Sequence, residues 1–313
     1  MISVVVPVYN EATNIHEVHR RCTQAMQAVG AYELVFVNDG SRDHTLEMLR
    51  EIAARDPRVL VISFSRNFGH QIAVTAGLDH ARGDAVVVID GDLQDPPELI
   101  PDMVAKWKEG YQVVYARRRR RKGEGLFKKI TAFAFYRVMR AMTATDIPVD
   151  AGDFRLIDRA VVDVLKNMRE RSRFIRGMVS WAGFRQVGIE FERDPRHSGE
   201  TKYPLPKMIR FALNGIFSFS DKPLKIASYI GLISSLVGML MILWGLYSKL
   251  FHPETTITGW ASVFVAVLFI GGIQLFTIGI IGEYISRIYD ESKARPLYVV
   301  GETIRNEPPG PDA

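Results

Sequence analysis

Cysteine is almost absent from this sequence, which holds one, Cys22, in 313 residues. A single cysteine excludes an internal disulfide and any metal site built from several thiolates. It is typical of a reducing compartment, where a buried, unreactive thiol is the expected state. The apolar run at 2–6 follows Met1 directly, without a basic region or a small-residue cleavage site. We therefore expect no secretory signal peptide.

Charged residues are missing from two long stretches in the C-terminal third, 226–247 and 255–282. Each exceeds the ~20 apolar residues that a helix needs to cross a bilayer core. The sequence predicts a transmembrane hairpin at 225–288, with spans at about 226–248 and 258–282.

The basic residues predict how this hairpin is oriented. Lysines and arginines precede the first span and follow the second, whereas the connection between them carries only Lys249. Because basic loops stay in the cytoplasm, we expect a multi-pass protein of the cytoplasmic membrane with both termini inside. The predicted domains are then a cytoplasmic domain at 1–203 and a cytoplasmic tail at 289–313. The tail has one strand-like run and a proline-rich end that we expect to be disordered.

Short apolar segments alternate with helical patterns in the first part of the chain, which indicates an α/β domain. The predicted strands are 2–6, 32–38, 59–64, 84–90 and 111–116. These strands are apolar throughout rather than alternating, which favours a doubly wound, mostly parallel sheet covered on both faces. A later segment, 187–193, alternates and predicts an edge strand.

Polar residues follow four of the predicted strands, in the runs "PVYNE", "NDGS", "SRNFGH" and "IDGDLQDPP". Turns require such residues for their own geometry. However, the carboxyl ends of parallel strands meet at one edge, where α/β proteins bind their ligands. Four polar ends at one edge favour a binding site.

Asp90 and Asp92 flank Gly91 at the end of the fourth strand. In an extended segment, residues two apart point the same way, so both carboxylates can reach one cation. Gln94 adds a carbonyl oxygen. This all-oxygen set suits Mg²⁺ or Mn²⁺, which complete their shells with water and substrate phosphates. Calcium loops and plain turns also contain Asp-x-Asp.

The net charge of +5 and the pI of about 9.2 favour an anionic partner. A run of arginines opens the segment 117–142, in which basic and aromatic residues alternate in an amphipathic helical pattern. A second such pattern occupies 204–224. We expect both helices to lie at the membrane interface, with packing on the sheet as the alternative. We expect no nucleic acid, because no reading module accompanies the basic run.

Several motifs together resemble one enzyme family. They are "SVVVPVYNEATNI", "ELVFVNDGSRDHT", "SRNFGHQIAVTAGLDHARGD", "DGDLQDPPELI", "DAGDFRLID" and "SGETKYP". The chain resembles family-2 glycosyltransferases of the polyprenyl-phosphate type, which include dolichol-phosphate mannose synthases. The two spans are most similar to those of bacterial GtrB-like undecaprenyl-phosphate (bactoprenol) glucosyltransferases. The resemblance implies a GT-A fold, a sugar-nucleotide donor and a polyprenyl-phosphate acceptor.

The family pattern also implies roles for individual residues. It assigns Asp90, Asp92 and Gln94 to the metal. Relatives often have "DDGS" where this chain has "NDGS", so Asn38 replaces a carboxylate, and we expect an altered base or ribose contact rather than lost activity. The expected nucleotide and donor set comprises Pro7, Tyr9, Asn10, Glu11, Asn38, Asp39, Gly40, Ser41, Asn67, Asp90 and Gly91.

The acceptor chemistry predicts a need for cations. A phosphate monoester has a second pKa of about 6, so its oxygen is already largely anionic at neutral pH and needs little help from a base. It needs positive charge to approach the donor, and attack opposite the leaving group inverts the anomeric centre. The candidate phosphate-binding residues are Arg117, Arg118, Arg137, Arg155, Arg196 and Lys202.

Asp92 and Asp153 are the expected catalytic residues, the latter through the family resemblance. We expect Asp153 to orient sugar hydroxyls or a phosphate-binding arginine such as Arg155. The alternative is a purely structural pair between Asp153 and Arg155.

The expected reaction is inverting transfer of glucose from UDP-glucose to undecaprenyl phosphate. GDP-mannose, galactose and a modified arabinose are alternative donors, and a non-catalytic scaffold or flippase partner is the alternative of another class. A processive synthase should carry Gln-x-x-Arg-Trp, which "RFIRGMVSW" does not match, and a dehydrogenase should carry Gly-x-Gly-x-x-Gly after the first strand. Glycines in both spans suggest close helix packing, so we expect a homo-oligomer.

Overall fold

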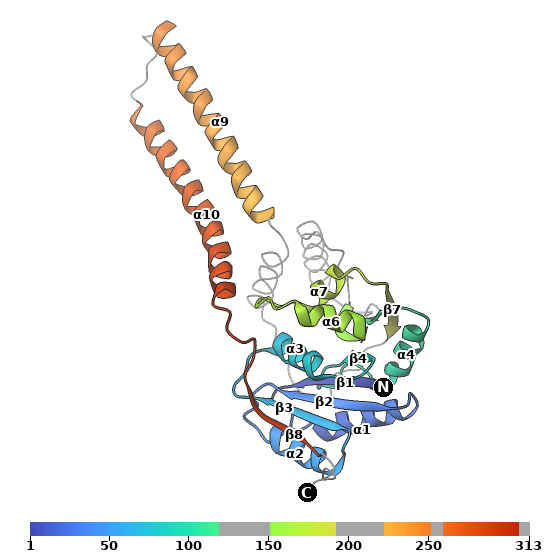
Figure 1. Ribbon diagram of the computed structural model, residues 1–313. Helices are drawn as coiled ribbons and strands as arrows, with labels where there is room; N and C mark the ends of the chain where they lie inside the picture. Colours follow the sequence, from blue (N-terminus) through green and yellow to red (C-terminus); the bar gives the residue numbers. More distant parts are fainter. Residues whose placement is uncertain (119–150, 192–221, 252–258, 307–313) are drawn as a thin grey trace, which may run out of the picture. The chain divides into compact units, whose positions relative to one another are not determined.

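The structure is a computed structural model that describes residues 1–118, 151–191, 222–251 and 259–306 (Figure 1). The contacts divide it into two compact units, the first built around one sheet and the second containing helices α9 and α10. The elements of the first unit are β1 (Ile2–Val8), α1 (Ile15–Gln27), β2 (Tyr32–Asn38), α2 (Thr45–Arg55), β3 (Val59–Phe64), α3 (His70–His80), β4 (Ala85–Val88), the 3-10 turn η1 (Pro97–Leu99), α4 (Ile100–Lys108), β5 (Val113–Arg118), β6 (Ala151–Asp158), α6 (Arg159–Asn167), α7 (Ile175–Trp181), β7 (Gln186–Phe191) and β8 (Val300–Arg305).

The sheet has eight strands in the order β7-β5-β6-β4-β1-β2-β3-β8. Strands β4, β1, β2 and β3 are parallel neighbours, and β5 and β7 form a further parallel pair. Strand β6 runs antiparallel to both β4 and β5, and β8 runs antiparallel to β3. The five strands predicted in the N-terminal part are confirmed, two of them at the predicted bounds and the others with ends that shift by at most two residues. The predicted edge strand is confirmed as β7.

Helices cover both faces of the sheet. In the view of Figure 1, α3 and α6 lie above the strands, and α1 and α2 lie below them. Strands β1, β2 and β3 are buried along their whole length, as their continuous apolar runs predict. Helix α1 contributes Ile15, Val18, Cys22 and Met26 to the core through one face. The cysteine is buried, as expected.

Two strands depart from the prediction. Strand β6 carries Asp153, Arg155 and Asp158 among apolar residues, so it lacks the apolar run that marks β1 to β4. Strand β8 confirms the strand-like run in the tail, but it completes the sheet of the first unit. Residues 295–306 therefore belong with that sheet, which corrects the separation of a tail at 289–313 from the domain at 1–203.

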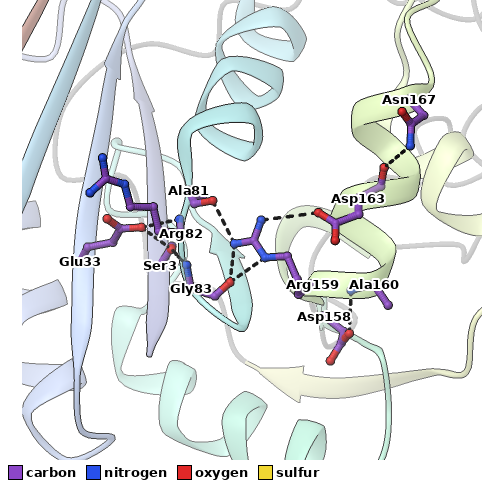
Figure 2. Close-up of polar contacts among 10 residues, drawn as sticks. All are labelled: Ser3, Glu33, Ala81, Arg82, Gly83, Asp158, Arg159, Ala160, Asp163 and Asn167. Carbon is purple, nitrogen blue, oxygen red and sulfur yellow. Dashed lines mark hydrogen bonds and ion pairs between the residues drawn. The ribbon is translucent and has the colours of Figure 1, made fainter.

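A polar network closes the edge of the sheet opposite to the strand ends that carry the motifs (Figure 2). The Ser3 hydroxyl donates to Glu33 at 2.6 Å, and the Arg82 backbone N–H donates to the same Glu33 oxygen at 2.7 Å. Arg159, at the start of α6, donates to the carbonyls of Ala81 and Gly83. These contacts attach the loop after α3 to β1, β2 and α6, so the C-terminal end of α3 is fixed.

The second unit contains α9 (Lys222–Phe251) and α10 (Trp260–Ser292), which run side by side in Figure 1. Both are long and apolar enough to cross a membrane, over 222–247 and 265–292, and their side chains are almost entirely unburied within the chain. The expected helices at 117–142 and 204–224 lie almost wholly outside the described residues.

Candidate active site

The loops after β1 and β2 hold each other in place. Asn10 follows β1 with a positive φ of 55°, and its backbone N–H donates to the Ser41 hydroxyl at 3.0 Å. In return, the Arg42 N–H donates to the Asn10 side-chain oxygen at 2.8 Å. Tyr9 is exposed beside this loop, whereas Pro7 is buried within β1. The Glu11 carboxylate accepts a hydrogen bond from Asn14.

Asn38 and Asp39, at the end of β2, point into the protein rather than outward. Asn38 is 1% exposed, donates to the Ser63 hydroxyl at 2.9 Å and accepts from the Ser41 N–H at 3.2 Å. Its amide is therefore engaged with the neighbouring turn and strand. The asparagine that replaces the familiar carboxylate bridges two strand ends, so the geometry gives it a structural task in addition to any contact with a base.

Asp39 organises the loop between β3 and α3. Its two carboxylate oxygens accept the backbone N–H groups of Phe68 at 2.6 Å and Gly69 at 2.9 Å. Burial raises the pKa of Asp39 by more than these hydrogen bonds lower it. Gly40 has a φ of +66°, and a Cβ there would lie 2.5 Å from the Arg66 carbonyl carbon, so only glycine fits. Asn67 is exposed at the tip of the same loop.

The acidic motif follows β4. A Cβ on Gly91 would lie 2.8 Å from a Val8 methyl group, so this glycine lets the motif pack against the end of β1. Asp92 accepts the Gln94 backbone N–H at 3.1 Å. The Gln94 side chain is buried at 4% exposure, and its Oε1 has no hydrogen-bond partner among the described residues. A buried carbonyl oxygen in this state is suited to accept a ligand or a cation.

The register of β6 brings Asp153 to Asp90. Val88 on β4 pairs with Arg155 on the antiparallel β6, so Asp90, two residues after Val88, and Asp153, two residues before Arg155, lie at the same edge. His70, the first residue of α3, stands between them. Its Nε2 lies 3.5 Å from Asp90 Oδ1 and 3.4 Å from Asp153 Oδ2. The structure thus brings together the start of α3, the loop after β4 and the start of β6.

The charges of this cluster are strongly coupled. Burial raises the pKa of Asp90 to about 6, with Asp153, Asp95 and Asp92 adding to the effect and His70 opposing it. Burial would lower the pKa of His70, but the two carboxylates outweigh it and raise that pKa to about 8. Burial also disfavours the charged form of Asp153, yet His70 and Arg176 hold the pKa of Asp153 well below its usual range.

Arg176 and Gln71 also belong to this cluster, and neither is among the site residues predicted from the sequence. Arg176 on α7 donates through Nε to Asp153 Oδ1 at 2.7 Å. Gln71 on α3 approaches Asp153 Oδ2 at 3.5 Å through its amide and accepts the Ile175 N–H at 2.9 Å. His70 could have been found from its place in "SRNFGH". Arg176 could not, because it lies on a helix outside the four strand ends.

Arg155, the expected partner of Asp153, is 4% exposed and donates to the Gly152 carbonyl at 2.8 Å. Burial lowers the pKa of Arg155 to about 10. Among the acceptor candidates, Arg117 is exposed near the end of β5, and Arg118 is the last residue of that strand. Arg137, Arg196 and Lys202 lie outside the described residues.

The acidic motif fits a divalent cation that the protein would bind together with the substrate phosphates. Asp90, Asp92 and Gln94 offer oxygens only, and the buried Gln94 oxygen lacks a partner within the described ranges. No group of three or more His, Cys, Asp or Glu side chains in those ranges is placed to hold a metal ion. Mg²⁺ is often bound by one or two carboxylates together with substrate phosphates.

The sheet and its acidic edge define an α/β glycosyltransferase domain of the GT-A type followed by two apolar helices. The comparisons agree with this class. The sequence profile "Glycosyl transferase family 2" matches residues 3–165, and the profile "GtrB C-terminal hairpin" matches residues 222–288. The chain belongs to glycosyl transferase family 2 and is a glycosyltransferase, which rules out the non-catalytic alternative.

Similar proteins are found in several bacteria. The chain is 58% identical to "Uncharacterized glycosyltransferase YkcC" of Bacillus subtilis over 95% of this chain and 92% of that protein. It is 46% identical to "Uncharacterized glycosyltransferase sll0501" of Synechocystis over 96% and 95%. It is 42% identical to "SfII prophage-derived bactoprenol glucosyl transferase" of Shigella flexneri over 98% and 99%. The similarity therefore extends over both units.

Proposed function

We propose that this protein transfers glucose from UDP-glucose to a polyprenyl phosphate, with inversion, at the cytoplasmic face of the membrane. The observation that carries the proposal is the convergence of Asp90, Asp153 and His70 at the edge where Asp92 and Gln94 also lie. The relative from Shigella, named a bactoprenol glucosyl transferase, supports the sugar and the acceptor. GDP-mannose, galactose and modified arabinose remain the competing donors.

The donor side of the proposal assigns Asp90, Asp92 and Gln94 to a Mg²⁺ or Mn²⁺ ion. Such an ion, when bound, stabilises the negative charge of the departing nucleotide diphosphate. The loops after β1, β2 and β3 border the same edge, and their mutual hydrogen bonds fix them before substrate arrives. Exposed Tyr9 and Asn67 are the groups best placed to meet the nucleotide directly.

Asp153 serves in this proposal as an orienting anion rather than a general base. A carboxylate whose pKa is held low by an arginine and a histidine is a weak proton acceptor. The lipid phosphate needs no strong one, because its oxygen is already largely anionic. Asp153 can instead accept hydrogen bonds from the hydroxyls of the donor sugar. Arg117 and Arg118 contribute positive charge for the acceptor, with Arg137, Arg196 and Lys202 as further candidates.

The position of β8 supports the membrane topology. Strand β8 follows both candidate spans yet pairs with β3 in the same sheet as β1. A hairpin that crosses a membrane twice returns the chain to its starting side, so this pairing agrees with two spans. The basic residues on both flanks predict that this side is the cytoplasm. An anchored enzyme meets the phosphate without lifting the lipid tail out, which would cost about 0.8 kcal/mol per CH₂.

Incubating membranes that contain the protein with labelled UDP-glucose, UDP-galactose or GDP-mannose and Mg²⁺ tests the proposal. We expect label from UDP-glucose to enter the organic phase as a lipid that mild acid releases, and EDTA to abolish this transfer. Asp92→Asn should lose it, whereas Asp102→Asn, which changes an exposed carboxylate on α4, should retain it. Transfer from another nucleotide alone would replace the donor, and transfer by Asp92→Asn at the normal rate would refute the site.

The glycines of the two spans bear on the predicted homo-oligomer. A Cβ placed on Gly231, Gly238 or Gly245 of α9 would meet nothing within 4 Å, and the same holds for the glycines of α10. Among the residues that the structure describes, nothing packs against these glycines. Association through them remains a prediction, which cross-linking in membranes can test.

A further inference from the structure

The segment that follows the second apolar helix is attached to the catalytic unit at many points. Strand β8 pairs with β3 from Leu60 to Phe64, and the Ser65 N–H donates to the Val299 carbonyl at 3.0 Å. Arg50 on α2 binds Glu302 at 2.5 Å. Arg171, in the loop before α7, donates to the Arg295 carbonyl. We call residues 295–305 the strap.

Tyr298 is the point where the strap meets α3. Its hydroxyl donates to Asp79 near the end of that helix at 2.9 Å, and Arg169 binds the same carboxylate at 3.1 Å. Its ring stacks on Phe64, the last residue of β3, with centroids 5.1 Å apart. Burial and the Asp79 charge raise the pKa of Tyr298, so the hydroxyl remains a hydrogen-bond donor at neutral pH.

These contacts continue into the loop that borders the candidate active site. The Phe64 ring packs edge-on against the Phe68 ring, with centroids 5.5 Å apart. The Phe68 backbone N–H is one of the two donors to the Asp39 carboxylate. Helix α3, which Tyr298 holds through Asp79, begins with His70 and Gln71. One side chain of the strap therefore touches both supports of residues 65–70, namely the end of β3 and helix α3.

We propose that Tyr298 is a positioning residue for sugar transfer, which holds residues 65–70 in place for the donor from a segment beyond the second apolar helix. Tyr298 touches no substrate. It acts through Phe64 and Asp79, so its loss should loosen the donor side of the site. The acceptor candidates Arg117 and Arg118 lie on β5, which is separated from β3 by four strands, and they should be unaffected.

The test compares Tyr298→Phe and Tyr298→Ala in the full-length protein with Tyr111→Phe. Tyr298→Phe removes the hydrogen bond to Asp79 but keeps the ring on Phe64, whereas Tyr298→Ala removes both. Tyr111 is a matched control, since its ring packs against Arg185 and its hydroxyl bonds no described residue. Backbone hydrogen exchange of residues 65–70 is measured together with kcat and with KM for the sugar nucleotide and the lipid phosphate.

We expect faster exchange at residues 65–70 in Tyr298→Phe than in the unaltered protein, and faster still in Tyr298→Ala. The KM for the sugar nucleotide should rise about threefold to tenfold in Tyr298→Phe, the range for one hydrogen bond of ordinary strength, with the KM for the lipid phosphate unchanged. Tyr111→Phe should match the unaltered protein in every measurement.

Two results would overturn the proposal. One is unchanged exchange at residues 65–70 in Tyr298→Phe. The other is faster exchange with both KM values and kcat unchanged, because the strap would then be structural only. If Tyr298→Ala does not fold, the phenylalanine variant still decides. Hydrogen exchange and calorimetric nucleotide binding test the strap even if the acceptor proves not to be a polyprenyl phosphate.

Discussion

Replacing Arg176 with alanine tests whether Asp153 works as an oriented anion. In the structure, Arg176 Nε donates to Asp153 Oδ1 at 2.7 Å, and His70 Nε2 lies 3.4 Å from the other oxygen. The alanine variant leaves that carboxylate, which is 14% exposed, with His70 as its remaining ion-pair partner of this cluster. The carboxylate should then rotate away from the position in which we propose that it contacts the sugar.

The size of the effect follows from the type of contact. A hydrogen bond between charged groups contributes about 1.5–3 kcal/mol. The Arg176 side chain is 28% exposed, so water replaces part of the lost contact. We therefore expect the low end, about 1.5–2 kcal/mol, which corresponds to a fall of about tenfold to thirtyfold in kcat/KM for the donor. Arg176→Lys keeps the positive charge but lacks the planar guanidinium group, so its kcat/KM should lie between the values of the unaltered enzyme and Arg176→Ala.

Steady-state transfer with varied sugar nucleotide provides the assay, and Arg55→Ala, which removes an exposed arginine of α2, is the matched control. Asp153→Asn and the double variant complete a cycle. If the two residues act as a unit, the activation free energy derived from kcat/KM for the double variant should exceed that for Asp153→Asn by at most about 0.5 kcal/mol. Turnover of Arg176→Ala or of Asp153→Asn within twofold of the unaltered enzyme would refute the orienting role.

Three further predictions concern the scaffold. Burial raises the pKa of Cys22 to about 12, so thiol reagents should label it only after unfolding, and labelling of the folded protein would contradict this. Burial alone would raise the pKa of Asp56, but hydrogen bonds from Arg58 and His19 lower it to about 2. A depressed pKa stabilises the fold above the unfolded value, so about 2 kcal/mol should be lost between pH 4 and pH 2, and Asp56→Asn should flatten that part of a denaturation series. Gly40→Ala should lower the free energy of unfolding by more than about 1 kcal/mol in chemical denaturation. Gly110→Ala should cost less, because Gly110 shares the positive φ (+94°) but a Cβ there meets no other atom within 4 Å.

The donor edge of the fold could be predicted because its signals are local. Strands β1, β2 and β3 are mostly apolar and buried along their whole length, and polar turns begin where they end. Parallel strands must place those ends together. Asp90 and Asp92 could thus be assigned to one edge from order alone.

Contacts that depend on tertiary register could not be predicted in this way. Asp153 lies near Asp90 only because β6 runs antiparallel to β4. Strand β6 cannot be recognised from the sequence, because its polar residues interrupt the apolar pattern. Arg176 reaches Asp153 from α7, a short helix with no polar motif. For Asn38, the sequence shows that an asparagine replaces a carboxylate, but it does not show that the side chain points inward to Ser63.

The position of β8 also sets the order of events during synthesis. The ribosome must finish both apolar helices before it produces residues 300–305, so the emerging sheet has β3 as its outer strand until then. An unpaired strand edge invites pairing with other chains. The sheet of the catalytic unit therefore cannot be completed until both apolar helices have been synthesised. Membrane insertion of those helices and pairing of the last strand are thus expected to be coupled during biogenesis.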